Sequence, residues 1–387
     1  MRGFHMKHRK KILLPALLAL VLAAAMLLLS GCSSAVYVTV NARWQSGTAF
    51  DTDFSETLTY SVSFESAYDE EEAGWYIDID GANSSYTVTT ESLSAYQDPD
   101  QDPDGELHLN VYHIRTELIL SATYSFRYEK GGELTEIVSF GGDSGTEPDH
   151  IVTDVWFHSL TQVDGESQHA LEPIYSTRTV YSSHTASGYA SDDILWYNYS
   201  SAIKYNHAAT SAELSFTDGW GELSEEERQV SDSVYKYSYS GEGRNGEMTG
   251  LRDSYSAFDN EQLYFVARGL TYSASSAETV NVITESAGAQ NLSVSCSERA
   301  NTRGSFLLSS TDASAGTTTV SQVNADIFAA TVSFSLANAG NAQGAARTVV
   351  FAQERGYYNV PLRMEMPYAY SVVGTSIYTL TSFERTE

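Results

Sequence analysis

The stretch Leu58-Thr-Tyr-Ser-Val-Ser-Phe64 decides the fold class of this chain. Apolar and aromatic residues occupy every second position, and small hydroxyl residues lie between them. Alternate side chains of a β-strand point to opposite faces, so this pattern predicts a strand with one apolar face and one polar face. β-Branched and aromatic residues are also favoured in strands. The stretch therefore predicts a half-buried strand.

The same alternation recurs over most of the chain. Tyr124–Tyr128 and Leu134–Phe140 flank Gly131-Gly132, and a Gly-Gly pair between two such runs is a hairpin signal. Further runs of this kind occupy residues 75–79, 107–111, 152–160, 174–181, 194–205, 234–239, 279–284, 292–296, 331–336, 348–352 and 360–366. Because the strands have one polar face, we predict an all-β fold of antiparallel sheets, packed as a sandwich or curled into an open, curved barrel.

Two short segments carry helix signals instead. Ser224-Glu-Glu-Glu227 has the pattern of a capping box, in which the serine and the glutamate each accept a hydrogen bond from the other's backbone amide. In the segment Asp259–Gly269, Asp259 is suited to an N-cap and Gly269 to the position after the last turn. We therefore expect one or two short helices.

The amino terminus has the parts of a secretory signal. Five basic residues and no acidic residue fall before an uncharged apolar run, Ile12–Leu29. The tetrapeptide Leu29-Ser30-Gly31-Cys32 follows, and it resembles the lipobox of bacterial lipoproteins at all four positions. The resemblance implies that residues 1–31 are a signal peptide and that Cys32 receives a diacylglyceryl group.

This resemblance also predicts location and organisation. Two acyl chains give stable anchoring, so the protein is expected on the extracytoplasmic face of a bacterial membrane. Residues 32–34 are then the lipid anchor and a minimal tether. Residues 35–387 form an all-β extracytoplasmic region, either one large domain or two closely packed subdomains with a division near residue 190. The alternative is an uncleaved signal anchor with an incidental cysteine.

Charge and cysteine content exclude some classes of protein. The chain has 50 acidic and 22 basic residues, a formal net charge of -28, whereas nucleic-acid binding needs a basic footprint. Its two cysteines cannot build a disulfide scaffold. Cys296 alternates with Leu292 and Val294, which predicts a free, inward-facing thiol. A folded, acidic protein that does not bind nucleic acid remains.

The order of features in the body suggests a second, remote resemblance. Glu56-Thr-Leu-Thr-Tyr60 opens a strand, Asp259–Leu270 follows much later, and Arg355–Leu362 precedes a last strand ending Tyr378-Thr-Leu380. This order resembles an uncharacterised family of exported all-β bacterial proteins. The resemblance implies a curved antiparallel sheet. It brings no activity with it, because the family has none that is agreed.

One acidic stretch has the spacing of a calcium loop. In Asp100-Gln-Asp102-Pro-Asp104-Gly105, alternate carboxylates can converge on a hard cation, and the glycine permits a sharp turn. Asp100, Asp102 and Asp104 are therefore candidate Ca²⁺ ligands. Val111 stands where the bidentate glutamate of such a loop is expected. The alternative is a solvated, acidic hairpin tip.

Tyrosines are concentrated at alternate positions of two predicted strands. Rows of flat rings can stack on sugars or form a protein interface. The candidate binding surface consists of Tyr197, Tyr199, Tyr235, Tyr237 and Tyr239. The alternative is cross-strand packing of tyrosines on a half-buried sheet.

Together these patterns favour a non-catalytic binding or interaction module, with envelope glycan or another protein as the partner. The alternative is a carrier of a lipid or another apolar ligand inside an open β-barrel. A hydrolase is least favoured, because the sequence displays no triad, metal site or resolved pair of carboxylates.

Overall fold

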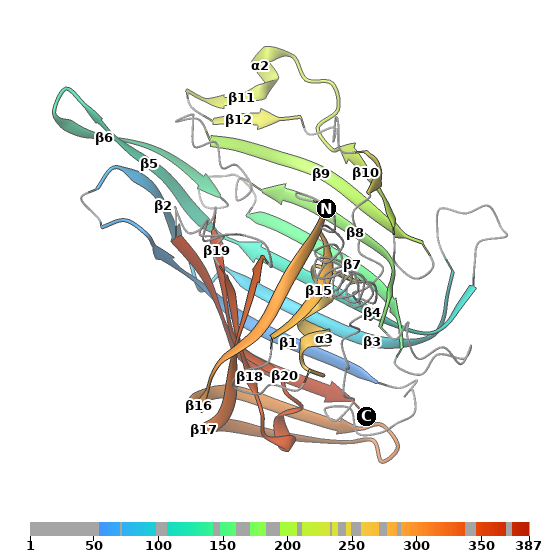
Figure 1. The fold of residues 1–387 in the computed structure, drawn as a ribbon. Helices are drawn as coiled ribbons and strands as arrows, with labels where there is room; N and C mark the ends of the chain where they lie inside the picture. Colours follow the sequence, from blue (N-terminus) through green and yellow to red (C-terminus); the bar gives the residue numbers. More distant parts are fainter. Residues whose placement is uncertain are drawn as a thin grey trace, which may run out of the picture.

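A computed structural model of the chain confirms the predicted all-β class (Figure 1). Most of the described residues lie in strands, and the two α-helices are short. The structure describes residues 54–69, 72–97, 107–141, 148–159, 171–182, 194–206, 211–232, 234–238, 245–248, 257–270, 277–284, 288–336, 346–368 and 374–386.

The elements follow one another along the chain with short connections. The first strands are β1 (Ser55–Ser66), β2 (Gly74–Ile79), β3 (Ser85–Gln97), β4 (Leu107–Leu120), β5 (Ala122–Lys130), β6 (Glu133–Gly141), β7 (Asp149–His158), β8 (Pro173–Ser182), β9 (Ile194–Tyr205) and β10 (Ala212–Asp218). The middle elements are α2 (Glu225–Arg228), β11 (Gln229–Ser231), β12 (Val234–Tyr237), β13 (Gly246–Met248), β14 (Ala257–Asp259) and α3 (Leu263–Ala267). The last elements are β15 (Ala277–Thr284), β16 (Gly288–Asp312), β17 (Thr317–Leu336), β18 (Arg347–Ala352), the 3-10 turn η4 (Arg355–Tyr357), β19 (Pro361–Tyr368) and β20 (Gly374–Thr386).

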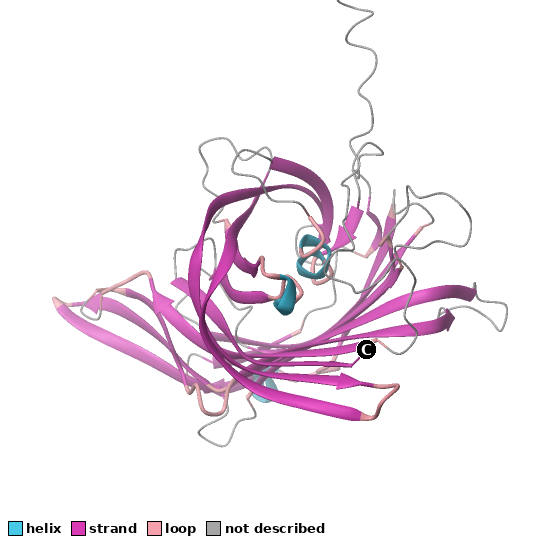
Figure 2. Ribbon diagram, turned by 90° about the horizontal axis from the view of Figure 1, so that it is seen from below, coloured by secondary structure: helices cyan, strands magenta, loops and turns pink. Residues whose placement is uncertain are grey.

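Seventeen of these strands form one large sheet. Its middle runs in the order β20, β1, β3, β4, β7, β8, β9 and β10, each antiparallel to the next. Strands β16 to β20 also pair in sequence, and the far end of β16 returns to pair in parallel with β20. These five strands therefore close into a ring. Figure 2 shows strands of the large sheet curling around a short helix.

Two local predictions are confirmed. β5 and β6 form a hairpin through Gly131 and Gly132, which have φ angles of 67° and 87°. Positive φ at both turn residues matches the right-handed twist of the flanking strands, and glycine adopts it without strain. This hairpin and β2 make a separate three-stranded sheet. Cys296 is buried and free, as its alternation with apolar neighbours predicts.

The two helices agree with the sequence in place and differ in detail. α2 has the predicted capping box, with Ser224 and Glu227 each accepting from the other's backbone amide. α3 is N-capped by Gln262, so the prediction that Asp259 caps it is wrong. Asp259 instead ends β14, because its buried carboxylate takes partners on other elements.

The helix α3 lies within the curve of the large sheet. All five of its residues are buried, which is expected of a helix that is apolar on every side. The inward faces of β1, β4, β7 and β8 pack in the same core, with Val155 and Phe157 fully enclosed. Within the described ranges, no helix combines the length and hydropathy needed to span a bilayer. Residue 190 falls between β8 and β9, which are adjacent antiparallel strands.

Candidate functional site

A buried cluster of charges fixes α3 to the sheet. Arg268 follows α3 directly, and its guanidinium donates to both carboxylate oxygens of Glu56 on β1, with the Nη2–Oε2 distance at 3.0 Å. Arg385 on β20 donates to Glu56 Oε2 over 3.4 Å. All three side chains are almost fully buried. Because a buried charge without a partner costs several kcal/mol, this Glu56–Arg268–Arg385 cluster holds its three elements in one arrangement.

A turn after η4 completes this cluster. The carbonyl oxygen of Tyr358 accepts from Arg268 Nη2 at 2.9 Å, and Asn359 Nδ2 donates back to the Arg268 carbonyl at 2.8 Å. The Arg385 guanidinium lies 4.0 Å from the centre of the Tyr358 ring, a cation–π contact. The cluster thus joins β1, the α3 segment, the turn after η4 and β20. These are the segments on which the sequence resemblance rests.

An apolar pocket runs beside α3 inside the sheet. It encloses about 380 Å³, within the range typical of small-molecule sites. Leu58, Val88 and Ile114 line it from β1, β3 and β4, while Phe265 and Met364 line it from α3 and β19. We call this cavity the apolar pocket. Its walls are fixed by the Glu56–Arg268–Arg385 cluster, because Arg268 itself is part of the lining.

A second cavity, the polar pocket, opens against the segment that precedes α3. It encloses about 330 Å³. Strands β7, β8 and β9 contribute Thr153, Ser176, Arg178 and Ser201, and the segment 259–261 forms the other wall. Its lining therefore consists mainly of hydroxyl, amide and charged groups.

Glu261 lines both pockets. Its Oε1 accepts from Asn260 Nδ2 at 2.9 Å, and its Oε2 accepts from Tyr86 at the long distance of 3.4 Å. Burial raises the pKa of the Tyr86 phenol well above its usual value, and the nearby Glu261 charge adds to this. Burial and Glu261 also raise the pKa of Tyr378. The carboxylate of Glu261 is thus the electrostatic centre of the interior.

Asp259, two residues earlier, is a buried acid at the edge of the polar pocket. Tyr205 donates to its Oδ2 at 2.6 Å, and the Glu261 amide donates to its Oδ1 at 3.0 Å. Burial raises the pKa of Asp259 to about 6, although these hydrogen bonds act in the opposite direction. Groups with shifted pKa values inside a concave pocket mark a candidate functional site.

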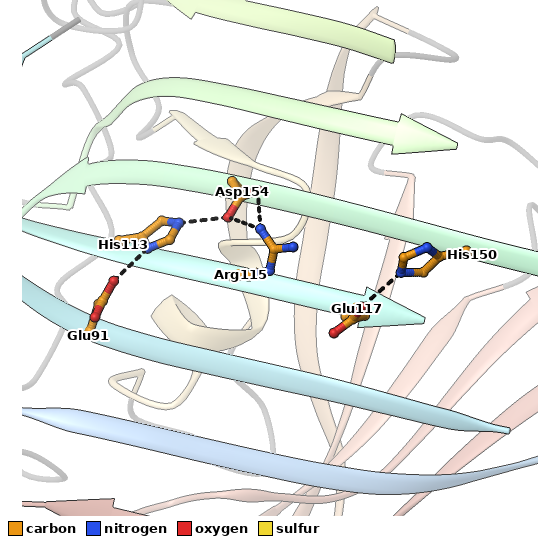
Figure 3. Close-up of polar contacts among 6 residues, drawn as sticks. All are labelled: Glu91, His113, Arg115, Glu117, His150 and Asp154. Atoms are coloured by element: carbon orange, nitrogen blue, oxygen red, sulfur yellow. Dashed lines mark hydrogen bonds and ion pairs between the residues drawn. The ribbon is translucent and has the colours of Figure 1, made fainter. Parts of the chain in front are cut away.

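A second group of ionisable residues lies on the opposite face of β3, β4 and β7 (Figure 3). His113 lies between two carboxylates, with Nδ1 3.0 Å from Glu91 and Nε2 2.8 Å from Asp154. Arg115 Nη1 binds the same Asp154 carboxylate at 3.0 Å. Burial lowers the pKa of His113, but the hydrogen bonds to Asp154 and Glu91 outweigh it, so the net shift is upward.

This outer cluster is built for structure. Both ring nitrogens of His113 already face carboxylates, so neither is available as a general base. The imidazole stacks on Trp156 at 4.8 Å, and Trp156 stacks on Tyr96 at 4.9 Å. Across the part of the chain that the structure describes, no three His, Cys, Asp or Glu side chains gather as a metal site. The interior pockets are therefore the stronger candidate site.

Several residues singled out in the sequence lie outside the described residues. They are Cys32, Asp100, Asp102, Asp104 and Tyr239. Lipidation of Cys32 and calcium binding by the three aspartates therefore stay predictions.

The other four tyrosines lie on β9 and β12, which pair in parallel. The Tyr197 and Tyr237 rings are 5.2 Å apart, and the Tyr199 ring packs 5.9 Å from Phe216 in the core. Tyr237 is 45% exposed, whereas Tyr199 is buried. Tyr235 donates to the carbonyl of Asp232 at 3.1 Å. The structure thus brings most of the candidate surface together, and its role in binding stays a prediction.

Sequence reasoning missed the interior site. Asp259 drew attention only as a helix cap, and Glu261 drew none. The available signal was the run Asp259-Asn-Glu-Gln262 directly before Leu263–Ala267, a helix with no polar face. Polar residues that lead into a fully buried helix must themselves enter the interior, where each needs a partner.

Comparisons with known proteins add one structural likeness. The chain matches no family model and no curated protein. Among solved structures it is similar to a β-barrel-like protein of a domain of unknown function, DUF1849, from Brucella abortus. The two share 7% sequence identity with a TM-score of 0.36, over 88% of this chain and 100% of that one. A likeness at this level identifies neither a family nor an activity for this chain.

Proposed function

We propose that this protein is a non-catalytic binding protein that carries a small apolar ligand in the pocket beside α3. The observation that carries the proposal is the apolar pocket, with Leu58, Val88, Ile114, Phe265 and Met364 on its walls. Burial of apolar ligand surface contributes roughly 25 cal/mol per Å², so such walls favour an apolar guest. Of the two binding functions suggested by the sequence, the apolar-ligand carrier has this additional support.

The proposal is tested by filling the pocket. Val88→Trp adds a large ring to the β3 wall and is expected to weaken binding of the apolar fluorophore N-phenylnaphthylamine by at least about 10-fold. Val88→Ala enlarges the same space and should leave binding intact or strengthen it. Fluorescence titration of the full chain measures both effects.

The matched control is Thr89→Trp. Thr89 is the next residue of β3, so its side chain points to the opposite face of the sheet. It should bind the fluorophore as the unchanged chain does. The proposal fails if Val88→Trp and Thr89→Trp alter binding equally, or if the folded chain takes up no fluorophore that Val88→Trp removes.

The proposed location is the extracytoplasmic face of a bacterial membrane, with Cys32 as the lipid-bearing residue. Its support is the lipobox resemblance at Leu29–Cys32. Cys32→Ala is expected to abolish incorporation of labelled fatty acid in cells and to release the protein from the membrane fraction. Cys296→Ala should change neither, since that thiol is buried in the fold. Retained labelling in Cys32→Ala would overturn the assignment.

A further inference from the structure

The apolar and polar pockets meet at one side chain. Glu261 lines both, with the apolar walls of β1, β3 and β4 on one side and the polar walls of β7, β8 and β9 on the other. Its Oε2 has only the 3.4 Å contact with Tyr86, at the long end of hydrogen-bond distances. That oxygen therefore has capacity to accept a stronger hydrogen bond from a group placed between the pockets.

The polar pocket offers donors and acceptors of several kinds. Thr153, Ser176 and Ser201 carry hydroxyls, which both donate and accept, and Asn260 carries an amide. A hydroxyl on a ligand can likewise donate to a carboxylate such as Glu261 and accept from a neighbouring donor. Hydroxyls on a ligand therefore match this lining better than a group that only donates or only accepts.

The charges at the polar pocket already face one another. Asp259 accepts from Tyr205 and from the Glu261 amide. Arg347, next to the pocket, donates to Asn260 Oδ1 and to the Tyr264 hydroxyl. Two acids, Asp259 and Glu261, are thus balanced by two arginines, Arg178 and Arg347. A charged head group would lose its hydration without gaining an opposite charge in excess, which is unfavourable in a buried site.

We infer that the polar pocket is the head-group half of the proposed ligand site, and that the ligand is an amphiphile with an apolar tail and a neutral, hydroxyl-bearing head. The inference rests on the proposed function, since the tail occupies the apolar pocket. Glu261 accepts a hydroxyl at the junction of head and tail, and the β7–β9 hydroxyls bind the rest of the head. Acylglycerols and glycolipids share this chemistry.

Four probes with the same ten-carbon tail test the head group. They are 1-decanoylglycerol, decanoate, decyltrimethylammonium and decylphosphocholine, each titrated against N-phenylnaphthylamine bound to the full chain, with native mass spectrometry to confirm the complex. We expect the glycerol ester to displace the fluorophore at a concentration about 10-fold lower than any charged probe, the equivalent of one or two hydrogen bonds.

Two variants locate the head. Glu261→Gln is expected to weaken binding of the glycerol ester about 10-fold and to bring decanoate closer to it, because a negative charge leaves the junction. Thr153→Val removes one hydroxyl at constant shape and should weaken the glycerol ester by about 5-fold without changing fluorophore binding. The controls are Glu298→Gln and Thr179→Val, which alter exposed side chains of β16 and β8.

The outcomes separate the two proposals. If the fluorophore binds in the apolar pocket but a charged probe competes as well as the glycerol ester, the head-group inference is wrong and the carrier function stands. If Thr153→Val and Glu261→Gln leave the order of the four probes unchanged, the polar pocket does not hold the head. If neither fluorophore nor probes bind, both proposals fail.

Discussion

Replacing Glu56 by alanine is expected to lower the free energy of unfolding by about 3 to 5 kcal/mol, the usual cost of removing one partner from a buried ion pair. Glu56 is 2% exposed and receives hydrogen bonds from both Arg268 and Arg385. Without it, two guanidinium groups remain in the interior with no carboxylate between them. The loss should appear as a large decrease in the denaturant midpoint.

The matched control removes an acid from an exposed ion pair. Arg303 and Asp326 lie 3.5 Å apart, and their side chains are 58% and 68% exposed. Asp326→Ala should cost less than about 1 kcal/mol, because water screens such pairs. If Glu56→Ala is no more destabilising than Asp326→Ala, the Glu56–Arg268–Arg385 cluster does not hold the fold together.

Asp259→Asn is expected to have the opposite sign. Burial raises the pKa of Asp259 from 3.8 to about 6, so the folded state holds its proton more tightly than the unfolded state does. Ionising this acid in the folded protein near pH 7 therefore costs about 2 to 3 kcal/mol, at 1.36 kcal/mol per pKa unit. Asparagine avoids this cost and still accepts from the Glu261 amide. The variant should be more stable than the unchanged chain at pH 7.

The pH dependence gives this prediction its test. As the pH falls through 6 towards 4, Asp259 takes up a proton in the folded state, and the unchanged chain recovers the lost stability. The difference between variant and unchanged chain in free energy of unfolding should therefore be largest at pH 7 and close to zero near pH 4. A difference that is constant over this range, or a less stable variant at pH 7, would contradict the assignment.

Local order could be predicted where one strand carries its own pattern. Leu58, Tyr60 and Val62 of β1 are all buried, as their alternation indicates. The length of β16 and β17 could not be predicted in this way. The alternating runs 292–296 and 331–336 cover only part of them, because their outer halves are exposed and carry polar residues on both faces. Backbone pairing between the two strands extends them without an amphipathic signal.

The candidate site was harder to predict, because it depends on tertiary contacts. Glu56 and Arg268 are 212 positions apart, and Glu56 and Arg385 are 329 apart. A charge in a strand pattern ordinarily indicates the solvent face, and only the fold reveals that these three face inward. Glu261 likewise looks like any other acid in a chain that contains 50 of them. The calcium-loop prediction at Asp100–Asp104 falls outside the described residues.

The pairing of β1 with β20 has a consequence for how the chain reaches this structure. Ser55 lies opposite Thr386, so neighbours in the sheet come from far-distant parts of the chain. A polypeptide that emerges from its amino terminus, from a ribosome or a translocation channel, must keep β1 without this neighbour until its last strand has arrived. Closing so long a loop costs entropy before any contact repays it, and topologies of this kind fold slowly. The strand that begins the sheet is therefore among the last to be fully enclosed, and Glu56 remains hydrated until Arg385 reaches it.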